Sequence, residues 1–170
     1  MIAIRPEEPR DIEAVRRVNQ LAFGRDAEAR IVDALRDAGK VTLSLVADDD
    51  GDVVGHVLFS PITLQPAPPS FKALALGPLA VLPERQGQGI GSRLVRLGVA
   101  QCLRDGADAI FLEGSLAYYS RFGFEPTAGK LVTTQPGISV AHLQVIEAWE
   151  GAIGTRPTTV LFAAEFFTSA

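Results

Sequence analysis

The sequence contains one cysteine, Cys102, which excludes a disulfide bond within the chain and is typical of a protein from a reducing cytoplasm. No apolar run approaches the roughly 20 residues that a membrane-spanning helix needs, and the first residues show no signal-peptide pattern. Basic residues form no block and the net charge is −4, which argues against a nucleic-acid partner. We therefore expect a cytoplasmic protein that engages neither membrane nor nucleic acid.

The sequence also lacks the residue pattern of a metal site. The two histidines, His56 and His142, lie far apart in the sequence, and no cluster of histidine, cysteine and carboxylate has the spacing of a metal site. Each histidine is expected in a strand with a local hydrogen bond, and Cys102 on the apolar stripe of a helix as a buried, unreactive thiol. The sequence predicts no metal cofactor.

What is present fits one domain spanning residues 1–170, with 47% hydrophobic residues. Two helices are expected after the N-cap residues Asp11 and Asp26, and a hairpin turn at Asp50-Gly51. Residues 61–70 are proline-rich and read as a connecting loop. Gly77-Pro78 is expected to form a bulge, because proline cannot donate to a strand ladder. The expected strands are 2–5, 41–47, 53–59, 71–82, 109–113, 142–149 and 159–162, with a helix at 89–105.

This order predicts an α+β fold, with a mixed, mainly antiparallel sheet flanked by helices. The helix at 89–105 connects the strands 71–82 and 109–113, and such a crossover makes the two strands parallel neighbours.

The segment 79–92 carries the clearest chemical signal. An apolar strand breaks at Pro83, three alternating glycines follow, and a helical apolar pattern begins at once. The first amides of a helix have no internal partner and carry positive potential, and glycines let a phosphate approach the backbone closely. The segment therefore predicts a site for a phosphorylated ligand that needs no lysine.

The glycine spacing identifies the kind of phosphate loop. A Walker loop needs Gly-Lys-Ser/Thr, which is absent, and Ser92 stands where the dinucleotide fingerprint needs its third glycine. The pattern Gln-x-x-Gly-x-Gly fits at Gln86, Gly89 and Gly91. It resembles the acyl-CoA pyrophosphate loop of the GNAT N-acetyltransferase superfamily. The alternative is that these glycines only form a turn and cap a helix.

A second motif follows at a fitting distance. Tyr119 lies four residues before Gly123-Phe124, as in the Tyr-x-x-x-Gly-Phe segment of the same superfamily. The run Tyr118 to Pro126 is most similar to the bacterial YhbS-like branch of predicted N-acetyltransferases. The resemblance covers roughly the whole chain and implies the GNAT acyl-CoA N-acyltransferase fold, a twisted sheet with a splayed parallel strand pair.

The resemblance also implies roles for particular residues. Acetyl-CoA would be the co-substrate, with its pantetheine arm along the strand and its pyrophosphate on the glycine loop. Tyr119 would be the general acid that protonates the coenzyme A thiolate, with Tyr118 as the weaker alternative. The implied coenzyme-binding residues are Leu79, Ala80, Val81, Gln86, Gly87, Gln88, Gly89, Ile90, Gly91 and Ser92.

The implied reaction is direct attack by a primary amine on acetyl-CoA in a ternary complex. Its general base stays open, because the strand 71–81 lacks the glutamate that many relatives use; the candidates are Glu28, Glu113 and a water molecule. The acceptor is expected to be a small-molecule or peptide amine, and the protein a monomer or homodimer. Two alternatives remain: a non-catalytic acyl-CoA sensor, and a nucleotide-binding oxidoreductase.

Overall fold

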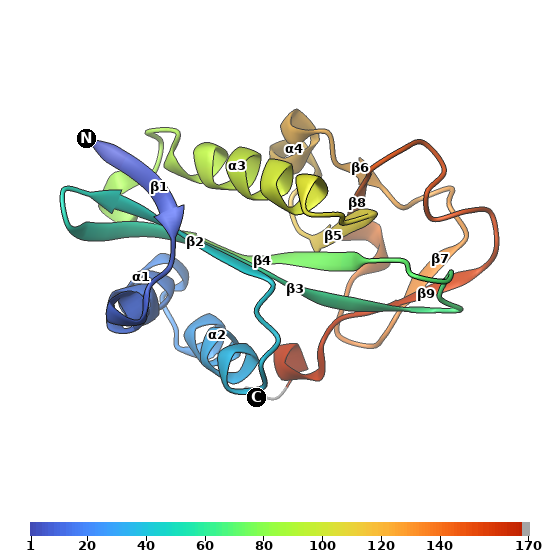
Figure 1. Cartoon of the computed structure of the whole chain (residues 1–170), viewed down its shortest axis with the longest axis horizontal. Helices are drawn as coiled ribbons and strands as arrows, with labels where there is room; N and C mark the ends of the chain where they lie inside the picture. The colour runs from blue at the N-terminus through green and yellow to red at the C-terminus, as the bar shows by residue number, and fades with distance from the viewer. Residues whose placement is uncertain (168–170) are drawn as a thin grey trace.

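The computed structural model describes residues 1–167. Within this range, nine strands form one sheet between two layers of helices (Figure 1). The strands are β1 (Ile2–Pro6), β2 (Leu43–Asp49), β3 (Asp52–Gln65), β4 (Ala73–Val81), β5 (Ala109–Glu113), β6 (Glu125–Pro126), β7 (Val132–Thr134), β8 (Leu143–Glu147) and β9 (Thr158–Leu161). The α-helices are α1 (Ile12–Phe23), α2 (Ala27–Asp37), α3 (Ile90–Arg104) and α4 (Leu116–Tyr119), and the 3-10 turns include η2 (Pro83–Arg85), η3 (Ser120–Phe122) and η5 (Ala164–Phe167).

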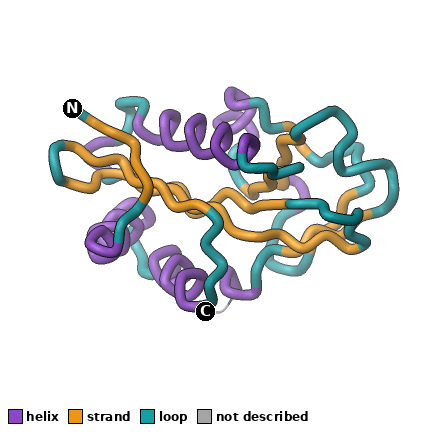
Figure 2. Tube along the Cα trace, viewed as in Figure 1, coloured by secondary structure: helices purple, strands orange, loops and turns teal. Residues whose placement is uncertain are grey.

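The sheet is mixed and mainly antiparallel, as predicted. Its strand order is β1-β2-β3-β4-β5-β8-β6, and β9 joins the far end of β3 and pairs with β7. Neighbouring strands are antiparallel except β4–β5 and β7–β9. Figure 2 shows the strands as a continuous band with the longer loops gathered at the end that holds β7 and β9. The predicted parallel pair formed by the strands before and after α3 is confirmed.

The helices divide between the two faces of the sheet. Helices α3 and α4 cover one face, and α1 and α2 cover the other (Figure 1). Helix α3 approaches β3 closely at Gly98, where an added Cβ would lie 2.5 Å from a ring carbon of Phe59. Cys102 is buried on the same helix, and burial raises the pKa of its thiol to about 12, so it stays protonated. No helix in the described part of the chain is both long and apolar enough to cross a membrane.

The two central strands separate beside a bulge. Val57 pairs with Leu79 and Phe59 with Leu76, so β4 carries one extra residue around Gly77-Pro78. Strand β4 pairs with β5 only from Ala73 to Ala75. Past that point no strand of the described chain pairs with the β5-facing edge of β4, which leaves main-chain groups open to an extended ligand. The predicted bulge and splay are both confirmed.

Three local expectations need correction. Residues 61–70 are not all loop, because β3 continues to Gln65 and its last residues pair with β9; tertiary pairing outweighs the turn preference of proline. Strand β2 begins at Leu43 rather than at residue 41. Asp11 and Asp26 do precede helices α1 and α2, but neither side chain caps its helix. Asp11 instead accepts hydrogen bonds from the Arg5 guanidinium at 2.7 and 2.9 Å.

A chain of polar side chains is buried under α1. The Nδ2 group of Asn19 lies 3.1 Å from His56 Nδ1, and Ser44 Oγ lies 2.9 Å from His56 Nε2. Ser44 in turn donates to Glu7, which pairs with Arg36. Because Asn19 donates to Nδ1, the Nε2 atom carries the proton and donates to Ser44, so His56 is neutral. His56 is a hydrogen-bonded strand histidine, as expected, but its partners come from α1 and β2 rather than from its own strand. The strand expectation is wrong for His142, which lies in the 3-10 turn Val140–His142, where Ser139 Oγ is 3.1 Å from its Nδ1 atom.

This burial predicts a pH-dependent stability. Desolvation, with the nearby charge of Arg36, lowers the pKa of His56 from 6.5 to about 3. The unfolded state therefore binds more protons between these values, and stability present above about pH 6.5 is lost as the pH falls toward 3. We expect His56→Gln to reduce the slope of the free energy of unfolding against pH, by up to about 1.4 kcal/mol per pH unit. Urea denaturation between about pH 4.5 and 7.5 measures it.

The exposed His142 provides the matched control for this experiment. His142→Gln removes a histidine from the surface and should leave the slope as in the wild type. Carboxylates also titrate in this range, but they are common to all three proteins and therefore do not contribute to the difference between their slopes. Equal slopes for wild type and His56→Gln would show that His56 is not the group that couples folding to pH.

Candidate functional site

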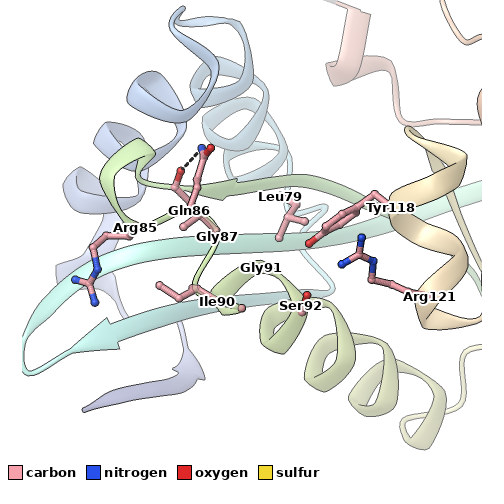
Figure 3. A pocket seen from close by; sticks show the side chains of 11 residues that line it. Leu79, Arg85, Gln86, Gly87, Ile90, Gly91, Ser92, Tyr118 and Arg121 are labelled. Atoms are coloured by element: carbon pink, nitrogen blue, oxygen red, sulfur yellow. Dashed lines mark hydrogen bonds between the residues drawn. The ribbon is translucent and has the colours of Figure 1, made fainter.

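A pocket of about 420 Å³ opens on the face of the sheet that carries α3 and α4. It lies between the end of β4, the loop that follows it, the first turn of α3 and the segment from α4 to η3 (Figure 3). Segments about 30 residues apart in the sequence therefore meet here. The lining residues are Leu79, Val81, Arg85, Gln86, Gly87, Gly89, Ile90, Gly91, Ser92, Tyr118 and Arg121.

The floor of the pocket is the glycine loop. Gly87 and Gly89 have φ angles of 75° and 79°, a left-handed conformation that favours glycine, and Gly89 is the N-cap of α3. The Nε2 group of Gln86 donates to the carbonyl oxygen of Val81 at 3.0 Å and ties the loop to the end of β4. The first amides of α3 have no partner within the helix. Backbone and helix dipole together provide a site for an anion.

Tyr118 forms the opposite wall. An added Cβ on Gly91 would lie 3.0 Å from the hydroxyl oxygen of Tyr118, so this hydroxyl lies against the first turn of α3. Ser115 caps α4 by accepting the N–H of Tyr118 at 3.2 Å. The guanidinium of Arg121 lies 4.8 Å from the centre of the Tyr118 ring. Figure 3 shows Tyr118 and Arg121 side by side, facing the glycine loop.

Tyr119, the predicted general acid, is not among the lining residues. Its ring packs edge-on against Tyr118 at 4.9 Å and Phe124 at 6.0 Å between ring centres. It also lies so close to Gly114 that an added Cβ there would be 2.8 Å from the ring. Burial, with a smaller contribution from Tyr118, raises the pKa of Tyr119 to about 12, so the phenol is protonated at neutral pH. Its catalytic role stays a proposal.

The structure brings most of the predicted coenzyme-binding residues together at this pocket. Ala80 is buried on the other face of β4, opposite His56 in the register, so only its main chain is available. The Gln88 side chain is exposed and does not line the pocket. The predicted residues that do line it are Leu79, Val81, Gln86, Gly87, Gly89, Ile90, Gly91 and Ser92. Arg85 and Arg121 also line the pocket, and the sequence did not predict them. Their only signal in the sequence is a positive charge next to each of the two motifs.

The two carboxylate candidates for the base differ in their surroundings. Glu28 points inward from α2, and both its oxygens accept from Arg25 Nε at 3.0 Å. Glu113 is the exposed last residue of β5, and one of its oxygens accepts the N–H of Ser139. Leu112 lies on the α4 side of the sheet, near Gly114 and Tyr119, so the alternation of side chains puts Glu113 on the opposite face. In residues 1–167 no group of His, Cys, Asp or Glu could hold a metal ion.

A splayed parallel strand pair with an anion-binding glycine loop at its side defines the class of acyl-CoA acyltransferases with the GNAT fold. The family model described as the acetyltransferase (GNAT) family matches residues 8–124. The chain is 40% identical over 121 residues to an uncharacterized N-acetyltransferase, YjhQ, of Escherichia coli K12, covering 70% of this chain and 67% of that protein. It is 41% identical over 126 residues to YhbS of the same strain, covering 74% of each.

Solved structures of similar proteins support the same family. A GNAT-family N-acetyltransferase, YhbS of Escherichia coli, in complex with CoA superposes with a TM-score of 0.90 at 35% identity, covering 97% of this chain and 91% of that one. A GNAT-family acetyltransferase of Brucella melitensis in complex with acetyl-CoA gives 0.81 at 38% identity, with 98% of each chain covered. The protein belongs to the acetyltransferase (GNAT) family, and it is an acyltransferase.

Proposed function

We propose that this protein transfers the acetyl group of acetyl-CoA to a primary amine of a small molecule or peptide, by direct attack in a ternary complex. Acetyl-CoA is the acyl donor. The observation that carries the proposal is the position of the anion-binding glycine loop, directly beside the unpaired edge of β4. The two relatives solved with CoA and acetyl-CoA, at 35% and 38% identity, support the choice of donor.

The coenzyme would lie along elements already described. Its pyrophosphate accepts hydrogen bonds from the amides between Gln86 and Ser92, where no side chain intervenes at the glycines. Its pantetheine arm pairs with main-chain groups on the unpaired edge of β4 from Leu79 to Val81, like an added strand, although the Val81 carbonyl already accepts a hydrogen bond from Gln86. This path leads the thioester to the bulge at Gly77-Pro78, where the strands β4 and β5 separate.

The reaction then needs one base and one acid. The amine nitrogen attacks the thioester carbonyl carbon, the C–S bond of the tetrahedral intermediate breaks, and the amine loses a proton. We assign proton donation to the departing thiolate to Tyr119, on the motif that it occupies. Tyr118 is the alternative, because its hydroxyl faces the pocket.

For the base, the structure favours Glu113 over Glu28. Strands β4 and β5 pair with each other as far as Ala75 and Phe111. Gly77 and Glu113 lie two residues further along their strands, on the two sides of the gap where β4 and β5 separate. Glu113 lies on the face opposite the coenzyme pocket, from which an acceptor can approach without displacing the coenzyme. Among the described residues its carboxylate forms no ion pair, whereas Glu28 is paired with Arg25.

We expect Glu113→Gln to lower kcat/KM for the amine about tenfold, because it removes the group that accepts the proton of the amine. Glu28→Gln, the matched control, should change kcat/KM by less than about twofold. Steady-state kinetics with an identified acceptor measure both. A larger loss of kcat/KM in Glu28→Gln than in Glu113→Gln would make Glu28 the base. Wild-type rates in both variants would leave a water molecule as the base.

The proposed function itself is tested with purified protein, acetyl-CoA and a panel of primary amines. The panel should include amino acids, polyamines, aminoglycosides and lysine-containing peptides. Release of free thiol reports turnover, and mass spectrometry of the product identifies the acetylated nitrogen. Tight binding of acetyl-CoA with no turnover on any amine would favour the sensor alternative. Membership of the acetyltransferase family removes the oxidoreductase alternative.

A further inference from the structure

Two arginines stand on neighbouring aromatic rings at the outer side of the pocket. Arg121 lines the pocket, with its Cζ atom 4.8 Å from the centre of the Tyr118 ring. Arg96 of α3 has its Cζ atom 5.0 Å from the centre of the Phe122 ring. The two rings are themselves in edge-to-face contact, with centres 5.3 Å apart. The two guanidinium groups therefore belong to one local cluster between α3 and η3.

Neither arginine is neutralised by an acidic side chain. Across residues 1–167, Arg96 and Arg121 form no ion pair, whereas Arg85 at the other end of the pocket binds Asp49 at 2.8 Å. The chain carries a net charge of −4, yet these two cations without an acidic partner lie beside the same pocket. Stacking on an aromatic ring restrains a guanidinium without occupying its N–H donors, which stay available for a phosphate.

The cluster adjoins the glycine loop. Arg96 lies four residues after Ser92 on α3, so both project from the same face of the helix. Arg121 and the glycine loop line the same pocket. A ligand that puts one phosphate group on the loop can therefore reach the arginines with a second one.

We propose that Arg96 and Arg121 form a second phosphate site that binds the 3′-phosphate of coenzyme A. This inference rests on the proposed function, because it takes the glycine loop as the pyrophosphate site. Coenzyme A carries a third phosphate as a monoester on its ribose, and a monoester has nearly two negative charges at neutral pH. The pair gives the protein a preference for coenzyme A over 3′-dephospho-coenzyme A.

Calorimetric titration with these two nucleotides tests the proposal without any acceptor. We expect the wild type to bind coenzyme A about tenfold more tightly than 3′-dephospho-coenzyme A, as charge-assisted hydrogen bonds to one phosphate provide. Arg121→Gln should reduce this preference to about threefold, and Arg96→Gln combined with Arg121→Gln should remove it. The affinity for 3′-dephospho-coenzyme A should change by less than about twofold in each variant.

Arg104→Gln is the matched control, since it removes the same charge from the far end of α3 and should keep the wild-type preference. Thermal melting without ligand verifies that all variants are folded. Equal affinities of the wild type for the two nucleotides would overturn the proposal. An equal loss of affinity for both nucleotides in Arg121→Gln would also overturn it. That result would mean that Arg121 contacts the pyrophosphate or only packs against its neighbours.

Failure of the proposed function has a different signature. A wild type that binds neither nucleotide, or a Gly89→Val variant that binds both as the wild type does, would overturn the coenzyme site and this inference with it. If Gly89→Val weakens both nucleotides while the double arginine variant keeps the preference, only the second phosphate site is wrong.

Discussion

Gly89→Val is expected to weaken the binding of coenzyme A and acetyl-CoA by at least about a hundredfold. Gly89 has a φ angle of 79°, which a β-branched residue adopts only with strain, and it begins α3. A Cβ at this position meets no protein atom within 4 Å, so the fold has room for the side chain. The valine would instead occupy space that the pyrophosphate needs over the free amides of the helix.

Thermal shift and calorimetry measure this effect. A ligand that binds only the native state stabilises it by about 2.7 kcal/mol at a hundred times its Kd, so the wild type should melt at a clearly higher temperature with acetyl-CoA. Gly89→Val should show almost no ligand-induced shift.

Gly24→Val is the matched control for backbone strain. Gly24 also has a positive φ, 67°, and open space around its Cβ position, but it ends α1 far from the pocket residues in the sequence. This variant should lose stability and keep its ligand-induced shift. A Gly89→Val protein with the shift of the wild type would show that the phosphate site lies elsewhere.

Tyr119→Phe is expected to lower kcat about a hundredfold and to leave the affinity for acetyl-CoA nearly unchanged. The substitution removes one oxygen and keeps the ring that packs against Tyr118 and Phe124. Loss of a group that acts only in the transition state lowers kcat and kcat/KM together. Because burial raises the pKa of Tyr119 to about 12, its ionisation should produce no basic limb in the pH–rate profile below about pH 10.

Tyr118→Phe decides between the neighbouring tyrosines. Its hydroxyl lies against Gly91 in the pocket, so its removal should alter acetyl-CoA affinity by a few-fold more than it alters kcat. Single-turnover kinetics isolate the chemical step from product release. If Tyr118→Phe slows that step more than Tyr119→Phe does, the hydroxyl in the pocket is the acid; a wild-type chemical rate in Tyr119→Phe excludes Tyr119.

The amino-acid sequence was sufficient wherever function depends on the main chain or on local order. The proposed phosphate site uses backbone amides, and the left-handed backbone of its loop is one that glycine adopts readily, at Gly87 and Gly89. The bulge at Gly77-Pro78 follows from a missing N–H donor. The crossover helix made the parallel pair β4–β5 predictable, because such connections have a fixed handedness and follow the chain order. These features needed no knowledge of distant contacts.

Side-chain positions in the site depended on tertiary packing. Tyr118 and Tyr119 are adjacent in a short helix, so they point about 100° apart, and only the packing of α4 on the sheet decides which one faces the pocket. The sequence motif indicates Tyr119 as the general acid, whereas Tyr118 is the tyrosine that lines the pocket. Glu113 and Glu28 likewise differ in surroundings, one exposed and one paired with Arg25, that arise only after folding.

Length and pairing of the outer strands were decided by the tertiary structure as well. Strand β3 extends through Pro61 to Gln65 because β9, about 100 residues later, supplies hydrogen-bonding partners. The network from Asn19 through His56 to Ser44 and the arginine cluster of Arg96 and Arg121 join residues from different elements. Hydrogen bonds and stacking act over a few ångströms, and the sequence separation of the partners carries no local signal of their contact.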